Sequence, residues 1–222
     1  MPTEIAHATT LSALLLELGV MPHATAARYA AIVADPPWDY KTPGQIGKTL
    51  EHRPNRDLGL SKHGAGSVAR YGAMPLRDLM ALPVAAHATD NAHLYLWTTN
   101  TFMEQAHALA RAWGFEPKTI ITWTKTRIAD GRPSMKMGYY FRGATEHCLF
   151  AVRGSLRLQG PACATAILAP RLPHSVKPDD FYRIVEAQSP GPRLELFARK
   201  KRHGWHAWGD EVESDVFMGH NV

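Results

Sequence analysis

A carboxylate followed at once by two prolines and a tryptophan, Asp35-Pro36-Pro37-Trp38, is the segment of this sequence best suited to chemistry. The side chain of Asp35 and the carbonyl of Pro36 can accept the two N–H bonds of an amino group. Accepting them favours a pyramidal nitrogen and compensates the charge that develops when an amine on an aromatic ring is methylated. Pro37 stiffens the turn. Trp38 could offer a flat face to a nucleobase, or it could anchor the core after a simple strand end.

The residues before this segment indicate how it is positioned. The small apolar run Ala31-Ile32-Val33-Ala34 predicts the end of a buried parallel strand. The prolines end that strand, because neither can donate a ladder hydrogen bond. Asp35 is therefore expected at the carboxyl end of a strand, where open α/β sheets bind their ligands.

The remaining chain alternates apolar strands with helices, which favours one α/β domain over residues 30–222 after an N-terminal extension over 1–29. Asn100 or Thr101 is expected to cap the second helix and Gly114 to end it. Residues 153–176 carry no clear pattern. Further strands are predicted at 93–98, 119–123, 146–152, 193–198 and 205–208, and helices at 75–82, 100–113 and 178–188.

Positive charge is concentrated in two segments, 41–71 and 124–145. Each has a net charge of +4, whereas the whole chain has +5, so the remainder is negative. This pattern predicts a polyanionic partner, and we interpret 39–71 and 124–145 as substrate loops. The aromatic residues 139–141 among the cations suit a single-stranded or flipped-out nucleotide, or else they anchor the loop.

The two cysteines, Cys148 and Cys163, cannot form a disulfide framework or a zinc site by themselves. We expect Cys148 to be a packed thiol and the protein to be cytoplasmic. No apolar run has the length of a membrane span, and a signal peptide is not expected. His203 and His206 have no acid or cysteine nearby, so no metal site is predicted.

Several segments together resemble one enzyme family. They resemble, in the same order, the N6-adenine methyltransferases related to the catalytic subunit of the eukaryotic mRNA adenosine methyltransferase. The resemblance covers the chain from about residue 30 to about residue 212. One such segment would be weak support, but the ordered set is specific. The segments are Asp35-Pro36-Pro37-Trp38, Tyr71-Gly72, Leu94-Tyr95-Leu96-Trp97, Trp123-Thr124-Lys125, Glu146-His147-Cys148-Leu149, Lys177-Pro178-Asp179 and Glu195-Leu196-Phe197.

This resemblance implies a Rossmann-like, mostly parallel α/β fold that uses S-adenosylmethionine. The order of its parts is circularly permuted, with the catalytic motif before the cofactor motif. By resemblance, Lys177 pairs with the methionine carboxylate and Phe197 lines the pocket. Because the sulfonium of the cofactor is positively charged, the acid Asp35 is also expected to bind near its methyl group. The residues implied for the ribose and adenine end are Arg199, Asp210 and Glu211.

The resemblance also implies that Tyr71 and Glu146 lie near the substrate, and the basic loop 124–145 makes Lys125 and Arg142 candidate substrate contacts. The alternatives are a core aromatic for Tyr71, a surface lysine for Lys177 and a turn acid for Asp210. This chain departs from the family pattern at three places. It has Ala198 where glycine is frequent, and Asp210-Glu211 where Asn-Gln is common. It has Lys200-Lys201-Arg202 in place of Pro-His-Asn, and this run could contact phosphate instead of cofactor.

The predicted function is methyl transfer from S-adenosylmethionine to the exocyclic N6 of adenine in nucleic acid. DNA is favoured, since a compact chain without zinc fingers or an added RNA module fits a prokaryotic or phage-type enzyme. The alternatives are an RNA adenine N6-methyltransferase, an inactive nucleic-acid-binding partner subunit, and an enzyme that methylates a protein or small-molecule amine. Since some relatives work as pairs, a homo- or heterodimer stays open.

Overall fold

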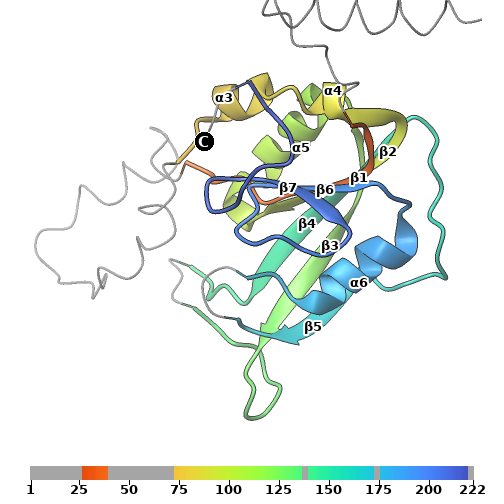
Figure 1. Cartoon of the computed structure of the whole chain (residues 1–222). Coiled ribbons are helices and arrows are strands. Elements are labelled where there is room, and N and C mark those ends of the chain that lie inside the picture. Colours follow the sequence, from red (N-terminus) through yellow and green to blue (C-terminus); the bar gives the residue numbers. More distant parts are fainter. Residues whose placement is uncertain (1–26, 40–72, 137–139, 173–175, 220–222) are drawn as a thin grey trace, which may run out of the picture.

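A seven-stranded sheet forms the centre of the computed structural model, which describes residues 27–39, 73–136, 140–172 and 176–219 (Figure 1). The strand order is β5-β3-β4-β2-β1-β6-β7. Within this sheet β4 alone runs antiparallel to its neighbours. The mostly parallel sheet expected from the sequence is thus confirmed. The strands are β1 (Tyr29–Ala34), β2 (Ala88–Thr98), β3 (Glu116–Thr126), β4 (Thr145–Arg153), β5 (Ala166–Pro170), β6 (Arg193–Leu196) and β7 (Trp205–Trp208).

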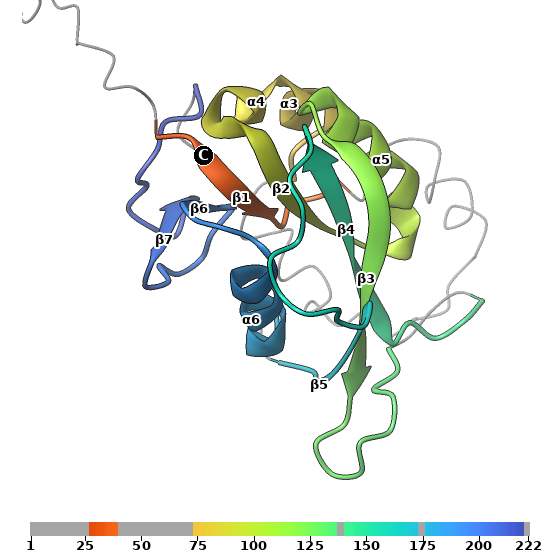
Figure 2. The same ribbon diagram turned by 90° about the vertical axis from the view of Figure 1, so that its right-hand side faces the viewer.

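Helices cover both faces of this sheet. Figures 1 and 2 show α3, α4 and α5 on one face and α6 on the other. The arrangement is the Rossmann-like α/β fold that the sequence predicts. None of the described helices is long and apolar enough to cross a membrane. The helices are α3 (Leu76–Ala81), α4 (Val84–His87), the 3-10 helix η1 (Asn100–Phe102), α5 (Met103–Ala112) and α6 (Asp179–Gln188).

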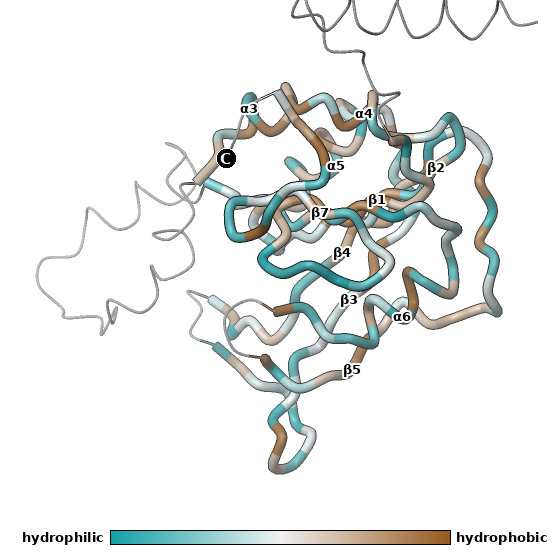
Figure 3. The backbone as a smooth tube through the Cα atoms, in the orientation of Figure 1, coloured by the Kyte–Doolittle hydropathy of each residue, from teal (hydrophilic) through white to brown (hydrophobic). Residues whose placement is uncertain are grey.

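Strand β1 lies in the interior of the sheet, and all six of its residues are buried. It pairs in parallel with β2 on one side and with β6 on the other. Among the described strands, the one that precedes Asp35 is first in sequence and its neighbour β6 is last but one. This is the permuted order that the sequence predicts. Figure 3 shows hydrophobic colour along β1 and hydrophilic colour on the segment that joins β6 to β7.

The alternation of side chains along β1 divides the core into two parts. Ile32 and Ala34 pack in the cluster on the side of α3, α4 and α5. Ala31 and Val33 pack in the other cluster, which includes Phe181 of α6. Because successive strand residues point to opposite faces, the next residue on the α6 face is Asp35. The α6 face is thus the face on which the site must be built.

Several element boundaries differ from the sequence expectation. Strand β2 begins earlier than predicted because Ala88 pairs with Tyr29 of β1, and β3 begins earlier because its ladder with β4 extends to Glu116. Strand β5 was not predicted; it is a short edge strand in which Ile167 and Ala169 are buried while Leu168 is exposed. The second helix begins with the η1 turn, and no side chain caps η1 or α5, so the predicted capping is wrong. Gly114 follows α5 with a φ of 82°, as expected for a helix end.

Candidate active site

Five of the predicted site residues lie at one edge of the sheet. Parallel strands end at a common edge, so the residues that follow β1, β6 and β7 are neighbours in space. Asp35 follows β1, Phe197 follows β6 and Asp210 follows β7. Lys125 lies near the end of β3, and Glu146 lies near the start of the antiparallel β4. Five elements thus contribute side chains to the same edge.

Four side chains at this edge form a continuous chain of ion pairs, which we call the charged cluster: Asp35, Lys177, Glu146 and Lys125. Lys177 Nζ lies 2.6 Å from Asp35 Oδ2 and 3.3 Å from Glu146 Oε2. Glu146 Oε1 accepts a hydrogen bond from Lys125 Nζ. The cluster therefore joins residues from β1, β3, β4 and the segment before α6, and its formal charges cancel.

Asp35 is the most exposed member of the charged cluster. The side chain of Asp35 is 31% exposed, whereas that of Lys177 is only 8% exposed. Both ammonium groups lie over indole rings, Lys177 at 4.9 Å from the ring of Trp97 and Lys125 at 4.8 Å from that of Trp123. Because charges buried this deeply persist only when they are paired, each member depends on its neighbours. Asp35 is the member that solvent and ligands can reach.

The pairing fixes the protonation states in the cluster. Burial disfavours the charged form of Lys177, but the carboxylates of Asp35 and Glu146 outweigh it and raise its pKa. Burial alone would raise the pKa of Glu146, and the ammonium groups of Lys177 and Lys125 together lower it below its ordinary value. Both groups are therefore ionised at neutral pH. Beside them, burial raises the pKa of the Cys148 thiol well above its ordinary range, so Cys148 is a packed thiol.

Lys125 lies in a different environment from the one expected of a basic-loop residue. The sequence predicts Lys125 in the loop 124–145 as a substrate contact, but β3 continues through it to Thr126. Its side chain is buried and paired with Glu146, so it is not presented to a phosphate. Lys177 is likewise buried, and the alternative of an ordinary surface lysine does not describe it.

The turn after β1 orients Pro36 and Trp38 differently from Asp35. The Pro36 carbonyl accepts the backbone N–H of Trp38 at 2.9 Å, which fixes its direction and leaves a second lone pair. Trp38 is only 6% exposed, and its indole N–H donates to the Trp97 carbonyl at 3.1 Å. Its ring stacks on Phe102 at 5.4 Å, in the cluster on the α3–α5 side. The structure thus favours the core-anchor interpretation of Trp38 over base stacking.

The loops after β6 and β7 are held close together. A Cβ on Gly209 would come within 2.2 Å of the Ala198 carbonyl oxygen, so only glycine fits there. The Ala198 N–H donates to the Trp208 carbonyl at 2.9 Å. Phe197 has a φ of 60°, which is strained for a bulky residue, and its ring lies edge-on to Trp208 at 5.3 Å. Backbone strain of this kind is found preferentially at binding and catalytic sites.

The remaining residues expected at the cofactor lie around these loops. Arg199 is half-buried, and Asp210 and Glu211 are exposed in the turn after β7. Within the Lys200-Lys201-Arg202 run, Lys201 pairs with Asp215 at 2.8 Å, and Arg202 pairs with Asp179 at 3.1 Å. Arg202 also lies 3.6 Å over the ring of Tyr182. These two basic residues thus take part in protein contacts.

Three residues near the cluster were not assigned to the site from the sequence: Trp97, Tyr182 and Glu195. Trp97 supports the ammonium of Lys177, and Glu195 accepts a hydrogen bond from the Tyr182 hydroxyl at 2.6 Å. Burial raises the pKa of Glu195. The signal that could have identified Trp97 and Glu195 is strand alternation, which places both on the face of Asp35.

The turn that directly follows β3, residues 127–132, projects away from the body of the molecule (Figures 1 and 2). Arg142 is exposed just before β4. Tyr140 is 87% exposed and Phe141 is 91% exposed, so these two aromatic residues do not anchor the loop in the core. Tyr71 and almost all of the loop 39–71 lie outside the described residues.

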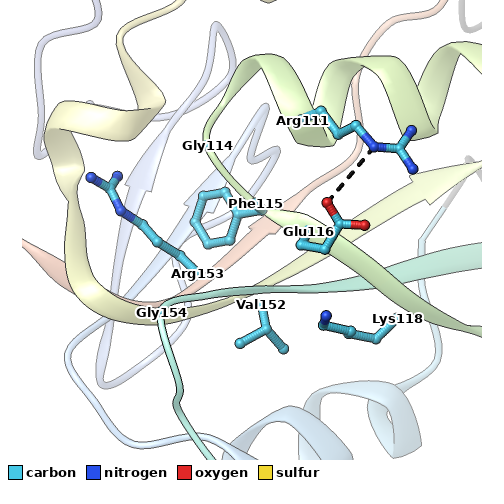
Figure 4. Close-up of a pocket in the computed structure, with 8 residues that line it drawn as sticks. All are labelled: Arg111, Gly114, Phe115, Glu116, Lys118, Val152, Arg153 and Gly154. Carbon is cyan, nitrogen blue, oxygen red and sulfur yellow. Dashed lines mark ion pairs between the residues drawn. The ribbon is translucent and has the colours of Figure 1, made fainter.

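A shallow depression of about 380 Å³ lies at the opposite end of the sheet (Figure 4). Glu116 at its edge pairs with Val152 across the β3–β4 ladder, whereas Trp123 pairs with Glu146. At about 3.3 Å per strand residue, the depression is roughly 20 Å from the charged cluster. It is therefore separate from the candidate site. Within the described part of the chain, no group of three or more His, Cys, Asp or Glu side chains could hold a metal ion.

Comparison of the sequence with known proteins relates this chain to methyltransferases. The family model MT-A70 matches residues 29–211. A type II methyltransferase, M.MunI, from Mycoplasma sp. is 30% identical over 87% of this chain and 82% of its own length. The human N(6)-adenosine-methyltransferase catalytic subunit METTL3 is 29% identical over 84% of this chain, but the match spans only 28% of METTL3. A putative N(6)-adenosine-methyltransferase MT-A70-like protein from Medicago truncatula is 29% identical, with 26% of its length matched. The chain belongs to the MT-A70 family of N6-adenine methyltransferases.

Proposed function

We propose that this chain transfers a methyl group from S-adenosylmethionine to the exocyclic N6 of adenine in DNA. The observation that carries the proposal is the position of Asp35. Its carboxylate is partly exposed at the carboxyl edge of the sheet and is held by the buried ammonium of Lys177. The Pro36 carbonyl follows it directly, with its direction fixed by the Trp38 N–H.

Asp35 and Pro36 supply what an aromatic amine lacks as a nucleophile. Its lone pair is delocalised into the ring, so it attacks poorly unless the nitrogen becomes pyramidal. A carboxylate and a carbonyl that each accept one N–H favour that geometry and compensate the positive charge that develops on nitrogen. S-adenosylmethionine, when bound, supplies an electrophilic methyl group on a sulfonium sulfur. On transfer the bond between the methyl carbon and sulfur would break and leave a neutral thioether, while the nitrogen gains the methyl group and releases one proton to solvent.

The residues at this edge fit such a cofactor. The Lys177 ammonium has three N–H donors, of which Asp35 and Glu146 engage two, so a third can meet the cofactor carboxylate. The strained Phe197 would form a wall of the pocket. In this proposal the acids Asp210 and Glu211 accept the ribose hydroxyls, and Arg199 binds the adenine end.

DNA is proposed over RNA because of the extent of the similarities. The relative matched along most of its own length is named a type II methyltransferase. The relatives named N(6)-adenosine-methyltransferases are matched over only about a quarter of theirs. For nucleic-acid contact, the exposed Arg142, Tyr140 and Phe141 offer a cation and two aromatic faces beside the candidate site. Tyr71 stays part of the proposal as a base contact.

The test is methyl transfer from labelled S-adenosylmethionine to matched DNA and RNA, each single- and double-stranded, with mass analysis of the digested nucleosides. The wild-type protein is compared with Asp35→Ala and with Asp180→Asn, an acid exposed on α6. N6-methyladenine in DNA that disappears only with Asp35→Ala supports the proposal. Methylation of RNA alone contradicts the choice of DNA. Cofactor binding without transfer to any substrate supports the inactive-partner alternative.

A further inference from the structure

We propose that Lys125 is a positioning residue that neutralises Glu146, so that the charge of Lys177 stays available for the carboxylate of the methyl donor. This inference rests on the proposed function, because it assumes that Lys177 receives that carboxylate. It assigns Lys125 a role in cofactor affinity instead of the substrate contact expected from the sequence.

The register of the sheet places Lys125 beside Glu146. Trp123 is the direct partner of Glu146 across the β3–β4 ladder, and Lys125 follows two residues later on the same face. The two lysines then bind different oxygens of Glu146, Lys125 at Oε1 and Lys177 at Oε2. Glu146 therefore holds both ammonium groups at once.

The number of positive and negative charges in the cluster determines how well Lys177 can bind a further carboxylate. With Lys125 present, two ammonium groups face the two carboxylates of Asp35 and Glu146. Without Lys125, the single ammonium of Lys177 would serve both carboxylates, and the incoming carboxylate would be a third acid around it. Like charges in a partly buried site repel strongly, because protein screens them less than water does. Removal of Lys125 should therefore weaken cofactor binding without any lost contact to the cofactor.

The experiment measures the Kd of S-adenosylmethionine by titration calorimetry for the wild-type protein and three variants. Lys125→Met keeps most of the side-chain volume and removes the charge, and we expect it to raise the Kd roughly tenfold, as for about one pKa unit of interaction. Lys118→Met is the matched control. It makes the same change in net charge at an exposed position on the same strand, and should leave the Kd unchanged. The double variant Lys125→Met with Glu146→Gln has no excess carboxylate, and should return the Kd to the wild-type value.

A second probe separates charge from structure. 5′-Methylthioadenosine lacks the amino-acid end of the cofactor, so its binding should be equal in the wild-type protein and in Lys125→Met. If Lys125→Met weakens both ligands alike, Lys125 acts through general structure and the inference is overturned. An unchanged Kd for S-adenosylmethionine in this variant overturns it as well.

The outcomes also separate this inference from the proposed function. If the wild-type protein binds no S-adenosylmethionine, the proposed function fails, and the inference fails with it. If the wild-type protein binds and the variants do not differ, only the inference fails. Should Lys125→Met alone not fold, the double variant decides, since wild-type affinity supports the inference and weak affinity contradicts it.

Discussion

Lys177 Nζ lies 2.6 Å from Asp35 Oδ2, although 142 residues separate the two in the sequence. The contact forms because β1 occupies an interior position in the sheet and α6, which begins just after Lys177, covers the face on which Asp35 lies. The residue proposed to hold the substrate amine and the residue proposed to hold the cofactor carboxylate therefore share one ion pair. A substitution at either residue should therefore change the charge balance around the other.

Lys177→Met should destabilise the fold by roughly 3 kcal/mol, because it removes the ammonium that pairs with Asp35 and leaves Glu146 with Lys125 alone. Denaturant unfolding monitored by circular dichroism would measure the loss. Arg183→Met is the comparison, since the Arg183–Asp180 pair is exposed and should contribute less than about 1 kcal/mol. Equal effects of the two changes would mean that the cluster is as well solvated as the surface.

Trp38→Ala should lower the free energy of unfolding by about 3–5 kcal/mol, since it empties a buried site against Phe102. Trp38→Phe should cost less, because much of the volume is kept. Thermal and denaturant unfolding of the two variants would check this. A Trp38→Ala protein with unchanged stability and weakened binding of adenine-containing substrate would instead restore the base-stacking role.

Gly209→Ala should separate the loops after β6 and β7, because the added methyl group would come within 2.2 Å of the Ala198 carbonyl oxygen. The expected loss of stability is about 1–3 kcal/mol, as for overpacking. We also expect weaker binding of S-adenosylmethionine by calorimetry. Gly143→Ala serves as the control, since a Cβ there meets nothing within 4 Å. A Gly209→Ala protein that matches this control would show that the loops can move apart at little cost.

Glu195 predicts a pH dependence of stability. Burial raises its pKa above the ordinary value of 4.5, whereas the unfolded chain ionises at that ordinary value. Between the two values the folded protein keeps a proton that the unfolded chain has lost, so stability falls as the pH rises through this window. Glu195→Gln cannot lose that proton. The variant should therefore gain stability relative to the wild-type protein between about pH 4 and pH 7, as measured by denaturant unfolding at both.

If the free energies of unfolding of Glu195→Gln and the wild-type protein differ by the same amount at both pH values, the raised pKa of Glu195 is contradicted. The comparison uses the difference between variant and wild type, so titrations elsewhere in the chain cancel. Tyr182 is kept in both proteins and can donate its hydroxyl hydrogen to either side chain at position 195. The measurement therefore reports on the carboxyl group of Glu195.

Local pattern was enough to predict the fold around the site. The apolar run before Asp35 and the two prolines after it predicted β1 and its end, because periodicity and the missing N–H of proline act within a few residues. The helix before Gln188 and the strand Trp205–Trp208 were predicted for the same reason. Strand β5 was not, because a short edge strand is defined by its pairing with β3 and carries little signal of its own.

The sequence by itself determined which residue types the site would contain and at which strand ends they would stand. Only the tertiary structure decided their partners, because register and the packing of α6 bring residues distant in the chain into contact. Lys125 proved to be buried because the β3–β4 ladder continues past Trp123. Trp38 lies on the opposite face from Asp35, held by its hydrogen bond to the Trp97 carbonyl and by stacking on Phe102. Burial then decided the electrostatics, since a lysine or carboxylate enclosed by protein stays charged only beside an opposite charge.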